Sequence, residues 1–495
     1  MADSLAMLAF DLGAESGRAI IGTLADDKLN LQEVHRFANR PICLPDGLHW
    51  DSLHLFAEIL TGLSKAAAVE GVEIASIGLD TWGVDFALLD SAGSLLGLPF
   101  HYRDSRTDGM LEAAFARVPR EEIFAVTGIQ FMQISTLYQL LAMAIADSPA
   151  LRVASHLLTI PDLLNYWLSG VMVNEFTNAT TTQCYNPITG TWAKEMLERM
   201  GIPSHIFGKV VQPGTVIGSL RADLAEAAGL APMPIIAPAC HDTGSAVAAV
   251  PSAEQNFAWI SSGTWSIMGV EWPEALVNEQ SLAFNITNEG GIDGTWRVSK
   301  NIMGLWLVQE ARRTWGQEDG VTASYDELAK LAAAAEPFTS VIDVDDDTFL
   351  PPGDMPARVR AYCKRTGQHV PEDKSQVMRC IYEGLALKYR WVLEHIEKML
   401  GTRFDAINIV GGGTQAEILS QFTADCTGRT VVTGPVEATA IGNLLMQARA
   451  LGRLSSKEEM RAIVRNSTEL NTYQPRSDAR WDAALAKLNE LIAKC

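Results

Sequence analysis

Asp242 is the residue whose type and position best suit acid–base chemistry. It follows an apolar, strand-like run at 235–239 and precedes the small residues 243–245, which suit the start of a helix. A carboxylate where a strand gives way to a helix can accept a proton from a hydroxyl group. The same pattern also fits an aspartate that only caps the helix. His241 directly precedes Asp242 and therefore lies at the same strand–helix junction, whichever role Asp242 has.

A turn of small residues near the start of the chain could bind phosphate. An apolar strand over 5–12 leads into this turn, and a second apolar strand begins at Arg18. Backbone N–H groups in such a turn can converge on a phosphate, and Arg18 supplies a positive partner. A hairpin turn without any ligand is the alternative. The turn consists of Gly13, Ala14, Glu15, Ser16 and Gly17.

Asp11 lies at the end of the first apolar strand. A carboxylate is costly to bury there unless it holds a cation, a water or a hydrogen-bond donor. Magnesium fits such a position, because Mg²⁺ keeps several waters and uses few carboxylates. A carboxylate that is bonded to the turn amides fits the position equally well.

A second strand–turn–strand pattern occupies 257–270, and its turn is Ser261, Ser262, Gly263 and Thr264. The turn offers hydroxyls and amides but no charge, as expected of a loop that closes over phosphates. Serine-rich turns of this kind also occur in purely structural roles.

Three glycines at 411–413 follow a further apolar strand that begins at Phe404. Without Cβ atoms, this backbone would allow a nucleobase or ribose to lie directly on it. The GxGxxG spacing of dinucleotide sites and the GK[ST] of a Walker loop are both absent. The strand over 74–80 takes the corresponding place earlier in the chain, and two echoes in the same order indicate an internal duplication.

Residues 80–85 place polar groups and an aromatic face beside Gly83. Hydrogen bonds to hydroxyls together with apolar packing are typical of small-ligand sites, including sugar sites. The charged stretch 102–106 could contribute to such a site or form structural ion pairs. The acidic residues of 343–347 could bind a cation or simply be solvated.

The elements that position these residues follow an α/β pattern, since apolar strands alternate with helical segments. At 495 residues the chain exceeds the size of a single core, so we expect two domains, 1–245 and 246–495. The clearest helix has apolar residues at Leu385, Tyr389, Val392, Ile396 and Met399 and is closed by Gly401.

The net charge of −20 repels nucleic-acid phosphates and anionic membrane surfaces. The start of the chain lacks the pattern of a secretory signal, and the apolar run at 140–146 is far shorter than the ~20 residues of a membrane span. We therefore expect a cytoplasmic protein with no nucleic-acid or membrane partner. The cysteines form no CxxC pair, although Cys363 and Cys380 could approach each other.

Taken in order, these motifs resemble the FGGY carbohydrate kinases of the actin-like ATPase superfamily, and within them the L-rhamnulose kinases most closely. The resemblance runs from about Leu8 to Pro475, and its most specific stretches are DTWGVDF at 80–86 and NIMGLWL at 301–307. The other stretches are DLGAESGR at 11–18, YRDSRT at 102–107, TNATTTQ at 177–183, HDTGSAV at 241–247, SSGTWSIMG at 261–269, NITNEGG at 285–291 and GPVEATAIGN at 434–443.

This resemblance implies two ribonuclease-H-like domains that flank a catalytic cleft, with sugar bound mainly by the N-terminal domain and ATP mainly by the C-terminal one. Asp242 would be the general base, and Asp11 would hold Mg²⁺. The sugar contacts would be Gly83, His241, Asp242 and Thr243. The nucleotide contacts would be Ala14, Glu15, Ser16, Gly17 and Arg18 at the phosphates, with Thr264, Asn301, Gln309 and Gly412.

The resemblance also implies transfer of a phosphoryl group from ATP to the 1-hydroxyl of a small ketose, with L-rhamnulose as the expected sugar. L-Fuculose or another deoxyketose is an alternative substrate. A non-catalytic actin-like sugar sensor is a further alternative, although it would not need Asp242. The expected partners are the sugar and ATP, and the expected assembly is a monomer or homodimer. Residues 414–416 read Thr-Gln-Ala where the family pattern has an Asn, which leaves the nucleotide preference open.

Overall fold

The computed structural model describes residues 4–254 and 256–494. Contacts divide the chain into two compact units, each assembled from three segments. The first unit contains Met1–Ala249, Glu271–Val298 and Ala438–Ser467, and the second contains Val250–Val270, Ser299–Glu437 and Thr468–Cys495.

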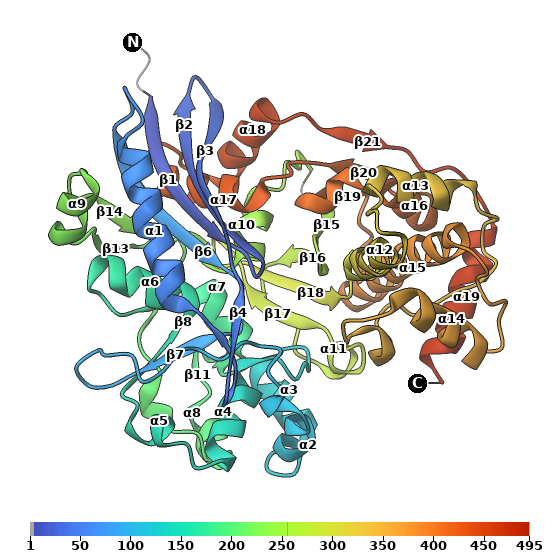
Figure 1. Ribbon diagram of the computed structural model, residues 1–495, viewed down its shortest axis with the longest axis horizontal. Helices are drawn as coiled ribbons and strands as arrows, with labels where there is room; N and C mark the ends of the chain where they lie inside the picture. Colours follow the sequence, from blue (N-terminus) through green and yellow to red (C-terminus); the bar gives the residue numbers. More distant parts are fainter. Residues whose placement is uncertain (1–3, 255, 495) are drawn as a thin grey trace. The chain divides into compact units, whose positions relative to one another are not determined.

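The first unit is built on a six-stranded sheet with the order β13-β14-β6-β1-β2-β3 (Figure 1). β1 and β2 are antiparallel neighbours, whereas β6 runs parallel to β1. The strand–turn–strand element predicted at the start of the chain is therefore confirmed. The strands are β1 (Leu5–Leu12), β2 (Ser16–Ala25), β3 (Lys28–Ala38), β6 (Ile74–Thr81), β13 (Val216–Ser219) and β14 (Pro234–Ile236).

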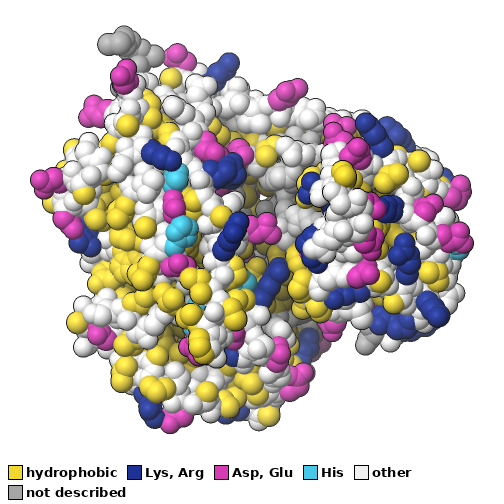
Figure 2. Space-filling view, viewed as in Figure 1, with side chains coloured by type: hydrophobic (Ala, Val, Ile, Leu, Met, Phe, Trp, Pro, Cys, Tyr) yellow, Lys and Arg dark blue, Asp and Glu magenta, His cyan; other side chains and the backbone are white. Residues whose placement is uncertain are grey.

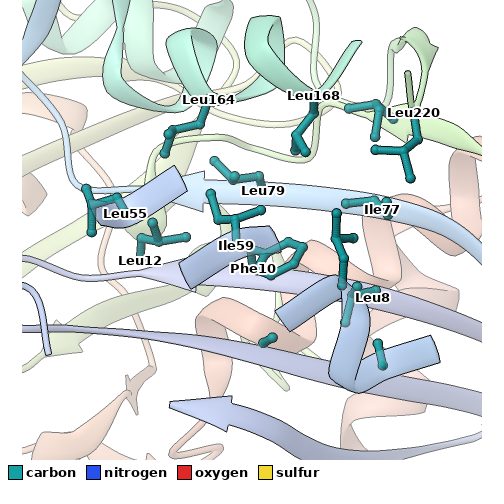
Figure 3. Close-up of a cluster of buried hydrophobic side chains, with 14 of the residues drawn as sticks. Leu8, Phe10, Leu12, Leu55, Ile59, Ile77, Leu79, Leu164, Leu168 and Leu220 are labelled. Carbon is teal, nitrogen blue, oxygen red and sulfur yellow. The ribbon is translucent and has the colours of Figure 1, made fainter. Parts of the chain in front are cut away.

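A hydrophobic cluster on one face of this sheet holds the unit together (Figure 3). Phe10 and Leu79 point into the cluster from β1 and β6, because alternate residues of a strand share a face. Helix α1 (Ser52–Ala67) contributes Leu55 and Ile59, whose spacing of four residues places them on one side of the helix. Helix α6 (Ile160–Ser169) adds Leu164 from its own buried side.

Further elements of the first unit surround this sheet. The helices are α2 (Met110–Phe115), α3 (Arg120–Thr127), α4 (Thr136–Ile145), α5 (Pro149–Val153), α7 (Phe176–Ala179), α8 (Lys194–Arg199), α9 (Ala222–Ala228), α10 (Asp242–Ala248), α11 (Glu279–Ala283), α17 (Ala438–Ala450) and α18 (Lys457–Ser467). The short strands are β4 (Pro41–Leu44), β5 (Gly47–Trp50), β7 (Phe86–Leu89), β8 (His156–Thr159), β9 (Asn174–Glu175), β10 (Tyr185–Asn186), β11 (Thr191–Trp192), β12 (Val210–Val211) and β17 (Thr287–Gly290).

The second unit repeats the central pattern of the first. β15 and β16 form an antiparallel hairpin, and β19 runs parallel to β15 just as β6 runs parallel to β1. This correspondence supports the predicted duplication. These strands belong to a seven-stranded sheet with the order β17-β18-β16-β15-β19-β20-β21. The strands are β15 (Phe257–Ser262), β16 (Ser266–Trp272), β18 (Trp296–Ile302), β19 (Ala406–Val410), β20 (Thr430–Thr433) and β21 (Asn471–Tyr473).

The predicted helix that ends at Gly401 is confirmed as the second half of α15 (Lys374–Leu400). Gly401 adopts φ 63°, the left-handed conformation that commonly ends a helix. The other helices of the second unit are α12 (Trp306–Asp319), α13 (Tyr325–Ala334), α14 (Met355–Arg365), α16 (Glu417–Thr427) and α19 (Arg480–Ile492).

Three of the four aspartates of 343–347 have basic partners within the second unit. Lys388 Nζ lies 2.8 Å from Asp343 Oδ1 and 3.1 Å from Asp345 Oδ2, and Arg365 pairs with Asp346. These ion pairs favour a structural role for the acidic cluster. Among the described residues, no group of three or more histidine, cysteine, aspartate or glutamate side chains is arranged to hold a metal ion.

Histidine side chains alternate with acidic ones over the part of the first unit where α1 lies (Figure 2). There His35 Nε2 lies 2.5 Å from Glu58 Oε2, and Lys65 Nζ contacts His35 Nδ1 at 2.8 Å.

Every cysteine that the structure describes is a free thiol, whereas Cys495 lies outside the described residues. Within residues 4–254 and 256–494, no helix combines the length and apolar character that crossing a membrane requires.

Helices α10 and α17 pack backbone against backbone at Gly442. A Cβ atom added to Gly442 would lie 1.8 Å from the carbonyl oxygen of Ser245. We expect Gly442→Ala to lower the free energy of unfolding by about 1–3 kcal/mol, as overpacking does in tightly packed cores. Urea unfolding measures this change, with Thr439→Ala on the same helix as the control. A Gly442→Ala protein as stable as the parent would contradict the close packing.

Candidate active site

Asp242 begins α10, and its carboxylate is held through one oxygen. The backbone N–H of Thr243 donates to Asp242 Oδ1 at 2.5 Å, and the Thr243 hydroxyl donates to the same oxygen at 3.1 Å. His241 Nε2 lies 3.4 Å from Oδ1 as well. All three groups face Oδ1, so Oδ2 is the oxygen that these contacts leave available to a ligand.

His241 is itself surrounded by buried charge. Its Nδ1 lies 3.0 Å from Arg297 Nη2 and 3.3 Å from Glu289 Oε2, and these two side chains form an ion pair at 3.2 Å. Burial opposes ionisation of Glu289, but the positive charge of Arg297 holds the pKa of Glu289 below its usual range. The sequence interpretation gave no role to Glu289 or Arg297, although Glu289 lies in the NITNEGG stretch.

Glu175 fixes the backbone that leads to Asp242. Its carboxylate accepts hydrogen bonds from the amides of Thr177 and Asn178 at the start of α7, and from the amide of Cys240. The Thr177 hydroxyl in turn accepts from the amide of His241 at 3.1 Å. Burial raises the pKa of Glu175 to about 7. Thr177, the first residue of the TNATTTQ stretch, therefore helps to fix the backbone next to the candidate base.

Gly83 lies next to His241. A Cβ on Gly83 would come within 3.3 Å of His241 Nε2 and 3.1 Å of Thr181 Oγ1, so a larger residue would crowd both. The following residue, Val84, has φ 67°, which is unusual for a β-branched side chain. Hydrogen bonds from Thr136 Oγ1 to Val84 O and from Val84 N to Thr181 Oγ1 hold this strained conformation. Such strain is concentrated at functional sites in proteins.

Asp85 gathers aromatic side chains around this loop. Its Oδ2 accepts from the indole N–H groups of Trp50 at 2.6 Å and Trp82 at 2.9 Å, and its Oδ1 accepts from Gln139 Nε2 at 2.8 Å. His101 stacks on Trp50 with ring centroids 4.2 Å apart. Of the stretch 80–85, Trp82 and Asp85 thus belong to one connected group of side chains, which also contains Trp50, Gln139 and His101.

Asp11 and Asp80 lie side by side on the parallel strands β1 and β6. Arg18 Nη2 donates to Asp11 Oδ2 at 2.5 Å, so the two residues that the sequence assigned to magnesium and phosphate contact each other. Asn443 Nδ2 donates to Asp80 Oδ2 at 2.6 Å. Burial, strengthened by the negative charge of Asp11 and of Asp242, raises the pKa of Asp80 well above its usual range.

The residues around Asp11 fit a magnesium ion. Two neighbouring carboxylates reach the same strand ends, and Asp80 Oδ1 is buried with no hydrogen-bond partner among the described residues. Mg²⁺ needs only one or two protein carboxylates when water and phosphate supply its other ligands. The lack of a three-carboxylate cluster is therefore compatible with Asp11 as a water-linked magnesium residue.

The turn between β1 and β2 contains the other residues that the sequence assigned to phosphate. Gly13 N donates to Ser16 O at 2.9 Å, and Asn39 Nδ2 donates to Gly13 O at 2.9 Å. These bonds fix the turn at the strand ends that also carry Asp11 and Asp80. The structure thus brings Ala14, Glu15, Ser16, Gly17 and Arg18 together with Asp11 in the first unit.

In the second unit, the turn after β15 packs on the start of α12. Trp306 N donates to Thr264 O at 3.0 Å, and Gln309 N donates to Leu305 O at 2.8 Å. Thr264 and Gln309 are therefore parts of one turn-and-helix unit. Asn301 lies on β18, two residues before Met303, whose amide donates to Asp345 Oδ1 at 2.8 Å.

The three glycines after β19 serve two different purposes. A Cβ on Gly413 would lie 2.0 Å from Ser262 Oγ, and one on Gly411 would lie 2.9 Å from Ser262 O, so both must be small to pack on the turn after β15. Gly412 has nothing within 4 Å of its Cβ position. Only Gly412 therefore matches the sequence interpretation of an open surface for a nucleotide.

Asp85 provides a test of the aromatic group. Asp85→Asn would turn an amide N–H₂ toward donors that now face a carboxylate oxygen, and buried unpaired donors cost about 1–3 kcal/mol. We expect the free energy of unfolding to fall by that amount in a urea titration. Asp90→Asn is the control, because Asp90 accepts from the amides of Ala92 and Ser94 through Oδ1, which asparagine retains. Equal stability of the two variants would contradict the assigned role.

Comparison with known proteins agrees with this arrangement. Residues 6–249 match the N-terminal domain of the FGGY family of carbohydrate kinases, and residues 258–451 match its C-terminal domain. A rhamnulokinase from Bacteroides thetaiotaomicron is 46% identical over 96% of this chain and 97% of its own length. A rhamnulokinase from Oceanobacillus iheyensis is 44% identical over 94% and 97%.

Among solved structures, a xylulose kinase from Lactobacillus acidophilus aligns with a TM-score of 0.82 over 99% of this chain and 97% of its own. Its sequence identity is 16%, so this match concerns the fold alone. The two-domain actin-like architecture expected from the sequence is thereby confirmed. Both domain models and both relatives agree that this chain belongs to the FGGY family of carbohydrate kinases.

Proposed function

We propose that this carbohydrate kinase transfers the γ-phosphoryl group of ATP to the 1-hydroxyl of L-rhamnulose. The choice of sugar rests on the two rhamnulokinases that match nearly the whole chain at 46% and 44% identity. The observation that carries the chemistry is the carboxylate of Asp242, which is fixed through Oδ1 and leaves Oδ2 for a substrate.

In this proposal Asp242 Oδ2 accepts the proton of the sugar hydroxyl as its oxygen attacks the γ-phosphorus. The bond between the γ-phosphorus and the bridging oxygen breaks, and ADP leaves. Phosphoryl transfer depends mainly on positioning and on stabilising charge, so a single fixed base suffices. His241 and Thr243 contact this carboxylate, Gly83 lies beside His241, and all three would orient the sugar.

Asp11 would hold magnesium through water, and a bound Mg²⁺ neutralises negative charge on the phosphates. Burial and the negative charge of Asp11 raise the pKa of Asp80, so its neutral form is favoured beside Asp11. Arg18 adds positive charge on the same side through its contact with Asp11.

We assign the nucleotide mainly to the second unit, where Thr264, Gln309 and Gly412 belong to the turns around β15, α12 and β19. Asn301 on β18 would contribute as well. The phosphates would contact the turn from Ala14 to Arg18. The first unit would bind the sugar. The proposed domains remain 1–245 and 246–495, whereas the first unit also takes in Glu271–Val298 and Ala438–Ser467. We place the enzyme in the cytoplasm, as a monomer or homodimer.

Replacing the proposed base tests the mechanism. Asp242→Asn keeps the shape of the side chain but removes its basicity, so we expect kcat to fall by about 10²–10⁴. Calorimetry should still show binding of sugar and ATP. Asp223→Asn, an exposed position of the first unit, is the control and should keep full activity. Near-normal turnover of Asp242→Asn would remove Asp242 from this role.

A substrate panel tests the sugar. ADP release with Mg-ATP is measured for L-rhamnulose, L-fuculose, L-ribulose, D-xylulose and glycerol. We expect the highest kcat/KM for L-rhamnulose. A higher value for L-fuculose would retain the kinase and change the substrate. Failure of all five, with sugar binding intact, would instead favour a non-catalytic sensor.

A further inference from the structure

His241 Nδ1 faces a hydrogen-bond donor and an acceptor at the same time. Arg297 Nη2 lies 3.0 Å from this nitrogen, and Glu289 Oε2 lies 3.3 Å from it. A ring nitrogen can accept from the first or donate to the second, but it cannot do both. The proton state of His241 therefore depends on which contact prevails.

The shorter contact determines the state, because a guanidinium can only donate. Arg297 is fully buried, and its Nε donates to Gly290 O at 2.8 Å, which fixes the plane of the guanidinium. An Arg297 N–H directed at His241 Nδ1 requires a lone pair on Nδ1. A neutral His241 then carries its proton on Nε2, which lies 3.4 Å from Asp242 Oδ1.

We propose that Arg297 and Glu289 are positioning residues that hold His241 as the neutral tautomer protonated on Nε2, and that this N–H orients the carboxylate of Asp242. The effect on catalysis rests on the proposed function, whereas the assignment of the His241 tautomer is independent of it. Together with the two donors of Thr243, the Nε2–H would keep Oδ1 occupied and direct Oδ2 to the sugar hydroxyl.

Glu289 contributes by holding Arg297 in place. Their charged groups lie 3.2 Å apart, and both side chains are almost completely buried. A buried guanidinium that loses its counter-charge is strongly destabilised and moves to find another partner. Glu175 and Asp242 also act on the charge of Arg297 and offer such alternatives. Removing the charge of Glu289 would therefore release the contact with His241 Nδ1.

The opposite tautomer would disturb the proposed base. With the proton on Nδ1, His241 would donate to Glu289, and the lone pair of Nε2 would face Asp242 Oδ1 at 3.4 Å. Two acceptors at that distance repel each other, so the carboxylate would rotate or shift. A displacement of about 1 Å at a reacting group can cost about 100-fold in rate.

Nitrogen NMR of the unmutated full-length protein tests the tautomer without any risk to folding. The chain has nine histidines, so the signal of His241 in ¹⁵N-histidine-labelled protein is assigned by its loss in His241→Gln. We expect Nδ1 to show the shift of an unprotonated ring nitrogen and Nε2 that of a protonated one. A proton on Nδ1, alone or in a doubly protonated ring, would overturn the proposal.

Kinetics of Glu289→Gln test the positioning role. We expect kcat to fall about tenfold or more, the KM for ATP to stay unchanged and the His241 signal to shift. Glu383→Gln is the matched control, since Glu383 is equally buried and pairs with Arg379 on α15 of the second unit. That variant should alter neither the signal nor kcat.

The two readouts separate failure of this inference from failure of the proposed function. If the parent protein phosphorylates none of the sugars, the nitrogen shifts still decide the state of His241. If the parent is active and Glu289→Gln matches it in kcat and in the His241 signal, the positioning role is wrong. Arg297→Lys provides a second variant that keeps the buried charge and loses the fixed plane of the guanidinium.

Discussion

The parallel pairing of β1 with β6 is the constraint on which the candidate site depends. The alternation that buries Phe10 and Leu79 in the hydrophobic cluster turns Asp11 and Asp80 to the other face of the sheet, where the two carboxylates are neighbours. That face is covered by α17, which contacts both strands, so Asp80 is removed from water. Burial makes its charged form unfavourable, and the hydrogen bond from Asn443 compensates for only part of that cost. The strand alternation that builds the hydrophobic cluster thus also places Asp80 where burial raises its pKa.

Local sequence signals predicted the elements well, because they depend on neighbouring residues. The two hairpins, the strand ends at Asp11 and Asp80, and the helix closed by Gly401 all follow from periodicity and turn chemistry over short distances. The position of Asp242 at a strand–helix junction follows from the same kind of signal. The resemblance to a family then predicted the roles of these residues together, which no single motif could do.

Long-range partners could not be predicted in this way. Asn443 reaches Asp80 across 363 residues of sequence, and Arg297 reaches His241 across 56. A buried acid before two glycines, as in Glu289-Gly-Gly, is the one local hint that an ion pair is needed. The glycines at 411–413 show the converse: their type was evident, but the packing of Gly411 and Gly413 on Ser262 became apparent only from the fold.

A base for a hydroxyl proton must be fixed in space and still accept a proton, and these requirements conflict when donors surround the whole carboxylate. Each donor that stabilises the charged form lowers the basicity of the carboxylate, and it also occupies the oxygen that it contacts. The arrangement at Asp242 separates the two requirements, because Thr243 and His241 all act on Oδ1. Oδ1 then serves as the anchor, and Oδ2 is left open to a substrate hydroxyl. In the proposed mechanism, the buried pair of Glu289 and Arg297 would affect catalysis without touching the substrate, since it would determine whether His241 presents a donor or an acceptor to Oδ1.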